Sequence, residues 1–157
     1  MPEAKNIATH KEPGASANFL LHVDLADHGM PGKYEQLWAS RSTPTEFAIA
    51  SIPFFPYGLA LGDLVSTRGP EPPNLVVASV VRRSGHRTLR VGLSMYKTIP
   101  ELHEHLHREL VHSGLCYEWH GAEYVAIDLP TEGAEASLLE YLQPLATSHK
   151  LVYEIVE

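Results

Sequence analysis

Cysteine is almost absent from this chain of 157 residues, which contains one, Cys116. A single cysteine cannot form an internal disulfide or a zinc ribbon, and this is typical of a protein in a reducing compartment. No run of about eighteen apolar residues occurs, so we expect no transmembrane helix and no membrane partner. The polar N-terminus also lacks the apolar segment of a secretory signal. We therefore expect a cytoplasmic protein in which Cys116 is a buried structural residue rather than a nucleophile.

Basic residues are scarce in the C-terminal part of the chain. Residues 98–157 contain two of them, Arg108 and Lys150, against eleven Asp and Glu, whereas residues 1–97 contain ten basic and eight acidic residues. Nucleic acids are polyanions, and an acidic half repels them at long range. We therefore do not expect a nucleic-acid partner.

Glycine-rich phosphate loops are missing too. The sequence contains neither Gly-x-Gly-x-x-Gly nor a Walker loop, the motifs with which many proteins bind dinucleotides and nucleoside triphosphates. We therefore expect no cofactor. The composition itself, 44% hydrophobic and 20% charged, is typical of a folded globular protein.

The first half of the chain consists of short β-type segments separated by turn residues. Residues 1–17 are polar and lack periodicity, which predicts a disordered tail. Strands are expected near residues 19–26, 34–42, 45–53, 63–69, 74–84 and 86–94, with a turn at 70–73. Strands and turns at such close spacing are typical of a small, strongly bent sheet. We assign residues 18–85 to a β-barrel-like module.

Helical periodicity begins after residue 97. Thr98 and Glu101 match a capping box, and an apolar stripe follows on one helix face up to Leu110 before Gly114 ends the helix. A second amphipathic helix is expected around Leu142, and strands near residues 116–121, 122–130 and 151–157. Together with 86–94, the order is strand, helix, strand, strand, helix, strand, as in a ferredoxin-like βαββαβ unit. The predicted class is α+β, with residues 86–157 as the second module.

The stretch HEHLH, residues 103–107, fits the His-Glu-x-x-His signature of helical zinc hydrolases. His103 and His107 would share one helix face, and Glu104 would act as general base on a metal-bound water. The extended form of the signature needs a histidine at position 113, where this chain has Ser113. With ten histidines in the chain, a chance match is expected in roughly one of twenty shuffled sequences of this composition. We interpret the stretch as a solvated helix face, with a zinc site as the alternative.

Two further segments are not explained by periodicity. IPFFPYGLALGD, residues 52–63, is too rich in proline and glycine for a helix, and it either fills the core or lines a cleft with Tyr57 and Asp63 at its rim. RRSGHRTLR, residues 82–90, contains four arginines around a tight turn. These could bind a carboxylate or phosphate, or they could pair with the acidic C-terminal half.

The same two segments, extended to IPFFPYGLALGDLV and RRSGHRTLRVGL, resemble a bacterial domain-of-unknown-function family, the one numbered four-two-six-five. YEQLWASR, residues 34–41, is similar to the opening strand of that family, and the likeness covers residues 19–157. The resemblance implies positions for a site and no activity. Those positions are Phe55, Tyr57, Gly58, Gly62, Asp63, Ser84, Gly85, His86 and Arg90. HEHLH is not part of the family pattern, which weakens the zinc interpretation.

We predict that the protein is a binding or accessory module for a small molecule or a peptide. Its site would be a cleft between the two modules that receives an anionic or partly apolar ligand, formed by Phe54, Phe55, Tyr57, Arg83, His86 and Arg90. The alternative is a small cofactor-independent enzyme in which His86 is the general acid or base and Tyr57 or Asp63 orients it. An exposed strand edge could also pair in a homodimer.

Overall fold

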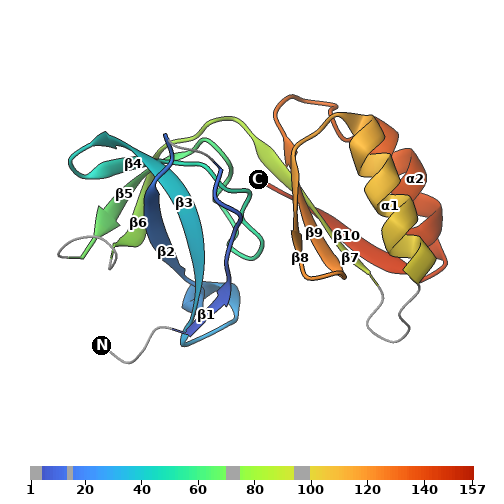
Figure 1. Cartoon of the computed structure of the whole chain (residues 1–157), viewed down its shortest axis with the longest axis horizontal. Coiled ribbons are helices and arrows are strands. Elements are labelled where there is room, and N and C mark those ends of the chain that lie inside the picture. The colour runs from blue at the N-terminus through green and yellow to red at the C-terminus, as the bar shows by residue number, and fades with distance from the viewer. Residues whose placement is uncertain (1–4, 14–15, 70–74, 94–99) are drawn as a thin grey trace. The chain divides into compact units, whose positions relative to one another are not determined.

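A computed structural model describes residues 5–13, 16–69, 75–93 and 100–157 of the chain. Its contacts divide the chain into two compact units, residues 1–86 with Glu157 and residues 87–156. The described residues form two sheets, two α-helices and a short 3-10 helix (Figure 1). The predicted α+β class is therefore confirmed, with a large excess of β-structure.

The first unit is a six-stranded sheet in the order β1-β3-β2-β6-β5-β4. Its elements are β1 Lys5–Ala8, β2 Phe19–Asp24, η1 Ala26–His28, β3 Lys33–Thr43, β4 Glu46–Ile49, β5 Leu64–Arg68 and β6 Val76–Arg82. The long strand β3 also pairs with β4, so the pairings return to their starting strand. Among the described residues, a single pair, His22 with Val76, joins β2 to β6. The sheet is thus strongly bent, but it is not a clean barrel.

The prediction of a disordered tail over residues 1–17 is wrong for residues 5–8. Lys5–Ala8 forms strand β1, which pairs in parallel with β3 and places Lys5 opposite Lys33. The side chain of His10, just after this strand, is fully buried. Strand pairing uses the backbone N–H and C=O groups, and every residue except proline has both. A short polar segment can therefore join a sheet without showing apolar alternation in its sequence.

The core of the first unit follows the alternation of β2 and β3. Leu21 and Val23 alternate with more exposed residues on β2, and Leu37 and Ala39 do the same on β3. Large apolar side chains contribute about 1.5–3 kcal/mol each when fully buried. The residues of this core are Leu21, Val23, Leu25, Leu37, Ala39, Phe47, Ile49, Leu59, Val65 and Leu75.

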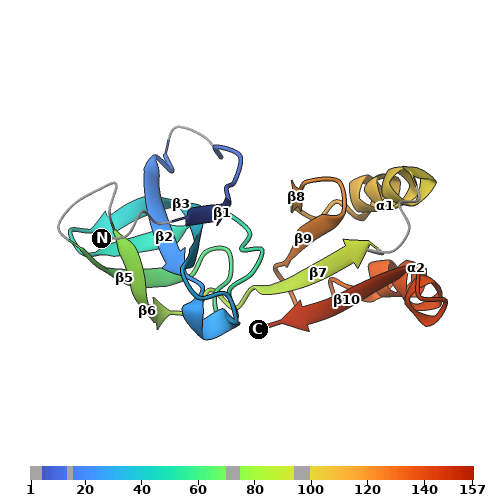
Figure 2. The same cartoon turned by 90° about the horizontal axis from the view of Figure 1, so that it is seen from below.

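The second unit is a four-stranded antiparallel sheet in the order β10-β7-β9-β8. Its elements are β7 Arg87–Leu93, α1 Pro100–Ser113, β8 Tyr117–His120, β9 Tyr124–Leu129, α2 Ala136–Thr147 and β10 Leu151–Val156. Both helices lie on one face of the sheet, as the two views in Figures 1 and 2 show. The sequence order is thus strand, helix, strand, strand, helix, strand, as expected.

The two helices bury most of the residues that the apolar stripes predict, although Leu139 and Leu145 of the second stripe are only partly buried. α1 buries Leu102, Leu106 and Leu110, and α2 buries Leu138 and Leu142. The predicted capping residue Thr98 and the predicted turn at 70–73 lie outside the described residues. In the part of the chain that the structure describes, neither helix has the length and apolar character needed to cross a membrane.

Cys116 is exposed, so its predicted burial is wrong. The residue lies in the segment that connects α1 to β8. The core of this unit is instead built from alternating strand positions and helix stripes, including Val91, Val125 and Leu106. Cys116 belongs to neither pattern and is therefore not part of this core.

An ion pair between β7 and the start of α2 predicts a pH-dependent stability. Arg87 Nη2 lies 2.8 Å from Glu135 Oε2, and the hydrogen bond from Arg87, with one from the backbone of Glu135, lowers the pKa of this carboxyl. Folding therefore favours the ionised form. The stabilisation is present above the ordinary glutamate pKa of about 4.3 and is lost as the pH falls through the lowered folded pKa.

We expect Glu135→Gln to reduce the free energy of unfolding by about 0.5–1 kcal/mol near pH 7. The difference from the wild type should shrink as the pH falls through the lowered folded pKa, because the wild-type carboxyl then becomes protonated as well. Urea titrations near pH 7 and at low pH measure this difference in the free energy of unfolding. Glu132→Gln, at an exposed position, is the control. An equal loss at the two pH values would contradict the ion pair as its cause.

Candidate ligand-binding site

The loop between β4 and β5 is fixed at its start by a buried carboxylate. Glu35, on β3, is completely inaccessible to solvent. Its Oε2 accepts the backbone N–H of Phe54 at 2.9 Å, and its Oε1 accepts that of Phe55 at 3.0 Å. His10 Nε2 lies 2.9 Å from Oε2. A buried carboxylate is costly unless its oxygens are hydrogen-bonded, and here both oxygens shape the loop.

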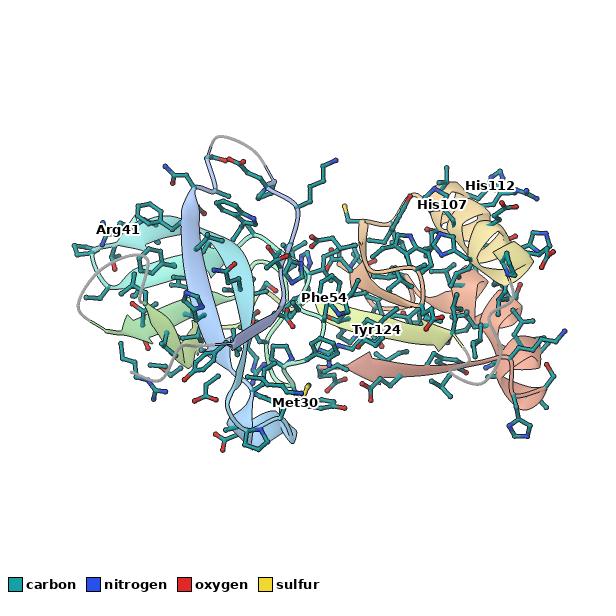
Figure 3. The ribbon with its side chains drawn as sticks, turned by 60° about the horizontal axis from the view of Figure 1, so that its bottom comes forward. Met30, Arg41, Phe54, His107, His112 and Tyr124 are labelled. Atoms are coloured by element: carbon teal, nitrogen blue, oxygen red, sulfur yellow. The ribbon has the colours of Figure 1, made fainter. Side chains whose placement is uncertain are left out.

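His10 joins the N-terminal segment to this loop. Its ring stacks on Phe54 with the ring centroids 4.1 Å apart, and its carbonyl accepts the indole N–H of Trp38 at 3.0 Å. Phe54 is labelled in Figure 3. His10 and Glu35 were absent from the predicted site because His10 lies in the predicted tail and Glu35 in a strand of ordinary appearance.

A second buried carboxylate fixes the end of the loop. Asp63 is 1% exposed. Its Oδ2 accepts the N–H of Ala60 at 3.0 Å, and its Oδ1 accepts the N–H of Ser84 at 2.8 Å. Ser84 Oγ in turn donates to the carbonyl of Leu61 at 2.7 Å. The two segments that carry the family resemblance are thus bound to each other through Asp63 and Ser84.

Gly62 is required by the closeness of this contact. Its φ angle is +85°, and a Cβ atom at this position would lie 3.1 Å from Ser84 Cβ. Residues with a side chain rarely adopt such a φ angle. The glycine therefore lets the loop turn directly against Ser84.

The loop fills the core at its two ends and exposes its middle. Phe54, Leu59 and Ala60 are buried, whereas Tyr57 is 54% exposed. Arg83 Nη1 donates to the carbonyl of Gly58 at 3.3 Å. The predicted core-filling role therefore applies to part of the segment, and Tyr57 is held at the surface next to a carbonyl that Arg83 binds.

A cavity of about 300 Å³ lies beside Tyr57 within the first unit. The end of β2, η1, the loop, β5 and β6 form its walls, and its polar side chains are Asp24, Asp27, His28, Tyr57, Arg68 and Ser79. His28 Nδ1 accepts the N–H of Tyr57 at 3.0 Å, and the two rings lie 6.0 Å apart. When His28 is neutral, its proton must therefore be on Nε2. His28 was also missed, because an isolated histidine in a turn carries no motif.

Of the predicted residues, Tyr57 and Gly58 are walls of this cavity and the others are not. His86 donates its backbone N–H to Ser84 Oγ at 3.1 Å. Arg90 belongs to β7 of the second unit, where it is 2% exposed and its Nη1 lies 3.9 Å from Glu154 Oε1. The structure defines each unit by itself, so the predicted cleft that would combine Arg90 with Tyr57 stays a prediction.

The histidines of HEHLH are not arranged as a zinc site. His103 Nδ1 donates to the carbonyl of Ala122 at 2.8 Å. The rings of His103 and His107 are nearly parallel, with an angle of 6° and centroids 6.4 Å apart. Two ligand nitrogens on one zinc must instead converge to about 3.4 Å from each other. Among the described residues, no group of three His, Cys, Asp or Glu side chains could hold a metal ion.

A family model described as "Domain of unknown function (DUF4265)" matches residues 35–153. The chain belongs to the DUF4265 family. This confirms the resemblance carried by the two sequence segments. The matched part of the DUF4265 protein includes Glu35, the whole loop with Asp63, and Ser84, whereas His10 precedes it.

The fold of the DUF4265 protein is similar to a solved structure. The crystal structure of a hypothetical protein from Neisseria gonorrhoeae matches it with a TM-score of 0.66 and 21% sequence identity, over 87% of this chain and 92% of that chain. At this identity, the likeness shows the fold alone. No curated protein matches the sequence.

Proposed function

We propose that this DUF4265 protein is a binding protein whose first unit holds a small ligand beside Tyr57. The observation that carries the proposal is the construction of the loop. Two buried carboxylates, Glu35 and Asp63, accept four backbone N–H groups and hold the exposed Tyr57 at the edge of a cavity. Binding residues are commonly placed on loops that a rigid scaffold positions. A loop that is ordered beforehand also loses less entropy when the ligand binds.

The charges around the cavity favour a ligand with a cationic group. Asp24 and Asp27 line the cavity together with a single arginine, Arg68. The exposed ring of Tyr57 is a surface on which an ammonium or amidinium group can rest. This differs from the anionic ligand that the arginines suggested, since Arg83 binds the carbonyl of Gly58 and Arg90 lies in the other unit.

Three probes that differ in one group test this proposal. Butylammonium, butanol and butyrate share an apolar chain and differ in charge. In protein-detected NMR titrations, we expect butylammonium to shift the amides of His28, Tyr57 and Arg68 with a Kd of about 1–10 mM. Butanol and butyrate should bind at least about fivefold more weakly, the difference that about 1 kcal/mol makes.

Tyr57→Ala should weaken butylammonium binding by about fivefold, because it removes the aromatic surface. Val81→Ala is the matched control, since Val81 is 51% exposed on β6 and is not a wall of the cavity. Equal affinity for butyrate, or shifts that are absent from the cavity residues, would contradict the proposal.

The enzyme alternative has less geometric support. Asp63, one of the two residues predicted to orient His86, directs its oxygens at the N–H groups of Ala60 and Ser84. A general acid or base role for His86 therefore stays a prediction. For the second unit, we propose the ferredoxin-like assignment, which its element order and its β10-β7-β9-β8 sheet support.

A further inference from the structure

A second site can be argued from the helical face that carries HEHLH. A groove of about 770 Å³ runs between α1 and the β8–β9 hairpin in the second unit. Its walls include His103, Glu104, His107, Arg108, Trp119 and Ala122. This groove is separate from the cavity beside Tyr57, because all of its walls belong to α1 and the β8–β9 hairpin.

His103 is held in one tautomer at this groove. A carbonyl oxygen can only accept a hydrogen bond, so the contact of His103 Nδ1 with the Ala122 carbonyl at 2.8 Å places a proton on Nδ1. Nε2 is then the nitrogen that remains for a ligand. The ring also packs against Trp119, with a centroid distance of 4.2 Å. The hairpin therefore fixes both the position and the protonated nitrogen of this histidine.

Arg108 is the charged hydrogen-bond donor in the walls of the groove. The Trp119 indole nitrogen is buried, and among the described residues no acceptor contacts it. Arg108 supplies a guanidinium group, which has five N–H donors. Glu104 is the one acidic side chain in the walls. Because the Trp119 indole nitrogen is inaccessible to solvent, a ligand in the groove meets the ring of Trp119 and not its N–H.

The remainder of the groove is apolar. Val111 is 59% exposed on α1, and it shares the walls with the Trp119 ring, Gly121 and Ala122. An aromatic ring is a surface on which a flat apolar group packs well. We propose that this groove binds a small organic acid, with its flat apolar body against Trp119 and Val111 and its carboxylate against the guanidinium group of Arg108.

This proposal gives HEHLH a role that needs no metal. His103 and His107 follow each other by one helical turn and present parallel rings along the groove wall. The second unit as a whole is acidic, so long-range attraction cannot bring an anion to it. Recognition must therefore depend on short-range hydrogen bonds, and added salt should change the affinity little.

The test uses three ligands with the same ring. Benzoate, benzamide and benzamidine are anionic, neutral and cationic, and the readout is the indole N–H signal of Trp119 in NMR spectra of the full chain. We expect benzoate to shift this signal in a saturable manner with a Kd of about 1 mM or below. Benzamide should bind about tenfold more weakly, and benzamidine should not shift the signal.

Arg108→Gln should weaken benzoate binding about tenfold, because it removes the charged partner at an exposed position. His112→Gln is the matched control, since His112 lies on the same helix (Figure 3) and is not part of the groove walls. Equal affinity for benzoate and benzamide would overturn the proposal. Unchanged affinity in Arg108→Gln, or no saturation by about 10 mM benzoate, would also overturn it.

Discussion

Glu35→Ala is expected to lower the free energy of unfolding of the first unit by about 3–5 kcal/mol. The substitution removes the carboxylate that accepts two backbone N–H groups, the buried one of Phe54 and the partly buried one of Phe55. It also removes the partner of His10, whose side chain is fully buried. Each of these polar groups would have to be rehydrated or stay unsatisfied, and the start of the loop would lose its anchor.

Urea unfolding followed by tryptophan fluorescence measures this effect. The chain has two tryptophans, and Trp38 lies in the first unit whereas Trp119 lies in the second, so Trp119→Phe gives a background that reports on the first unit alone. Glu35→Gln should have an intermediate effect, because one acceptor oxygen remains. Glu12→Ala is the control at an exposed position. A loss below about 1 kcal/mol for Glu35→Ala would contradict the anchoring role.

Asp63→Ala should be the next most damaging change, with a loss of about 2–4 kcal/mol. It removes the acceptor of the Ala60 and Ser84 N–H groups and so separates the loop from the turn at Ser84. Asp63→Asn should recover only part of the loss, because one carboxylate oxygen becomes an NH₂ group that faces an N–H donor. Urea titrations on the same Trp119→Phe background give the free energies.

The loss of Asp63 should also affect binding. If this carboxylate holds Tyr57 in place, Asp63→Ala should weaken butylammonium binding at temperatures where the variant is still folded. Asp27→Ala, at an exposed position, should leave the stability within about 0.5 kcal/mol of the wild type. If Asp63→Ala has the same free energy of unfolding as the wild type, then water or another group replaces the carboxylate without cost.

The helices and most strands could be predicted because local pattern and tertiary burial agree there. On α1, the spacing of Leu102, Leu106 and Leu110 predicts the face that becomes buried. On β3, Leu37 and Ala39 alternate with more exposed residues as a half-buried strand requires. In both cases, a periodicity of a few residues carries the information.

The site could not be predicted in the same way, because its contacts join distant parts of the chain. His10 and Glu35 are 25 residues apart, and Asp63 and Ser84 are 21 apart. One local signal was present: Glu35 is in phase with the buried residues Leu37 and Ala39. A charged residue at an inward-facing strand position indicates a buried carboxylate that needs partners, although it does not say which ones.

The arginines show how composition alone can mislead. The cluster around Ser84 left two interpretations open, an anion site or pairing with the acidic C-terminal half; Arg87 agrees with the second because it binds Glu135, and Arg83 binds a loop carbonyl. A guanidinium group has five donors and can serve structural carbonyls and carboxylates as readily as a ligand. The count of charges in a segment therefore does not reveal whether they are already used within the fold.

The order of the strands has a consequence for biosynthesis. Every pairing of the six-stranded sheet involves residues up to Arg82, so the first unit can fold as soon as this stretch leaves the ribosome. The second sheet differs, because β7 (Arg87–Leu93) pairs with β10 (Leu151–Val156), which follows it by almost sixty residues. Until β10 has left the ribosome, β7 has one edge without this partner, and such an edge can pair with other chains. Ribosome stalling or truncation near the C-terminus should therefore favour aggregation of the second unit, while the first is already folded.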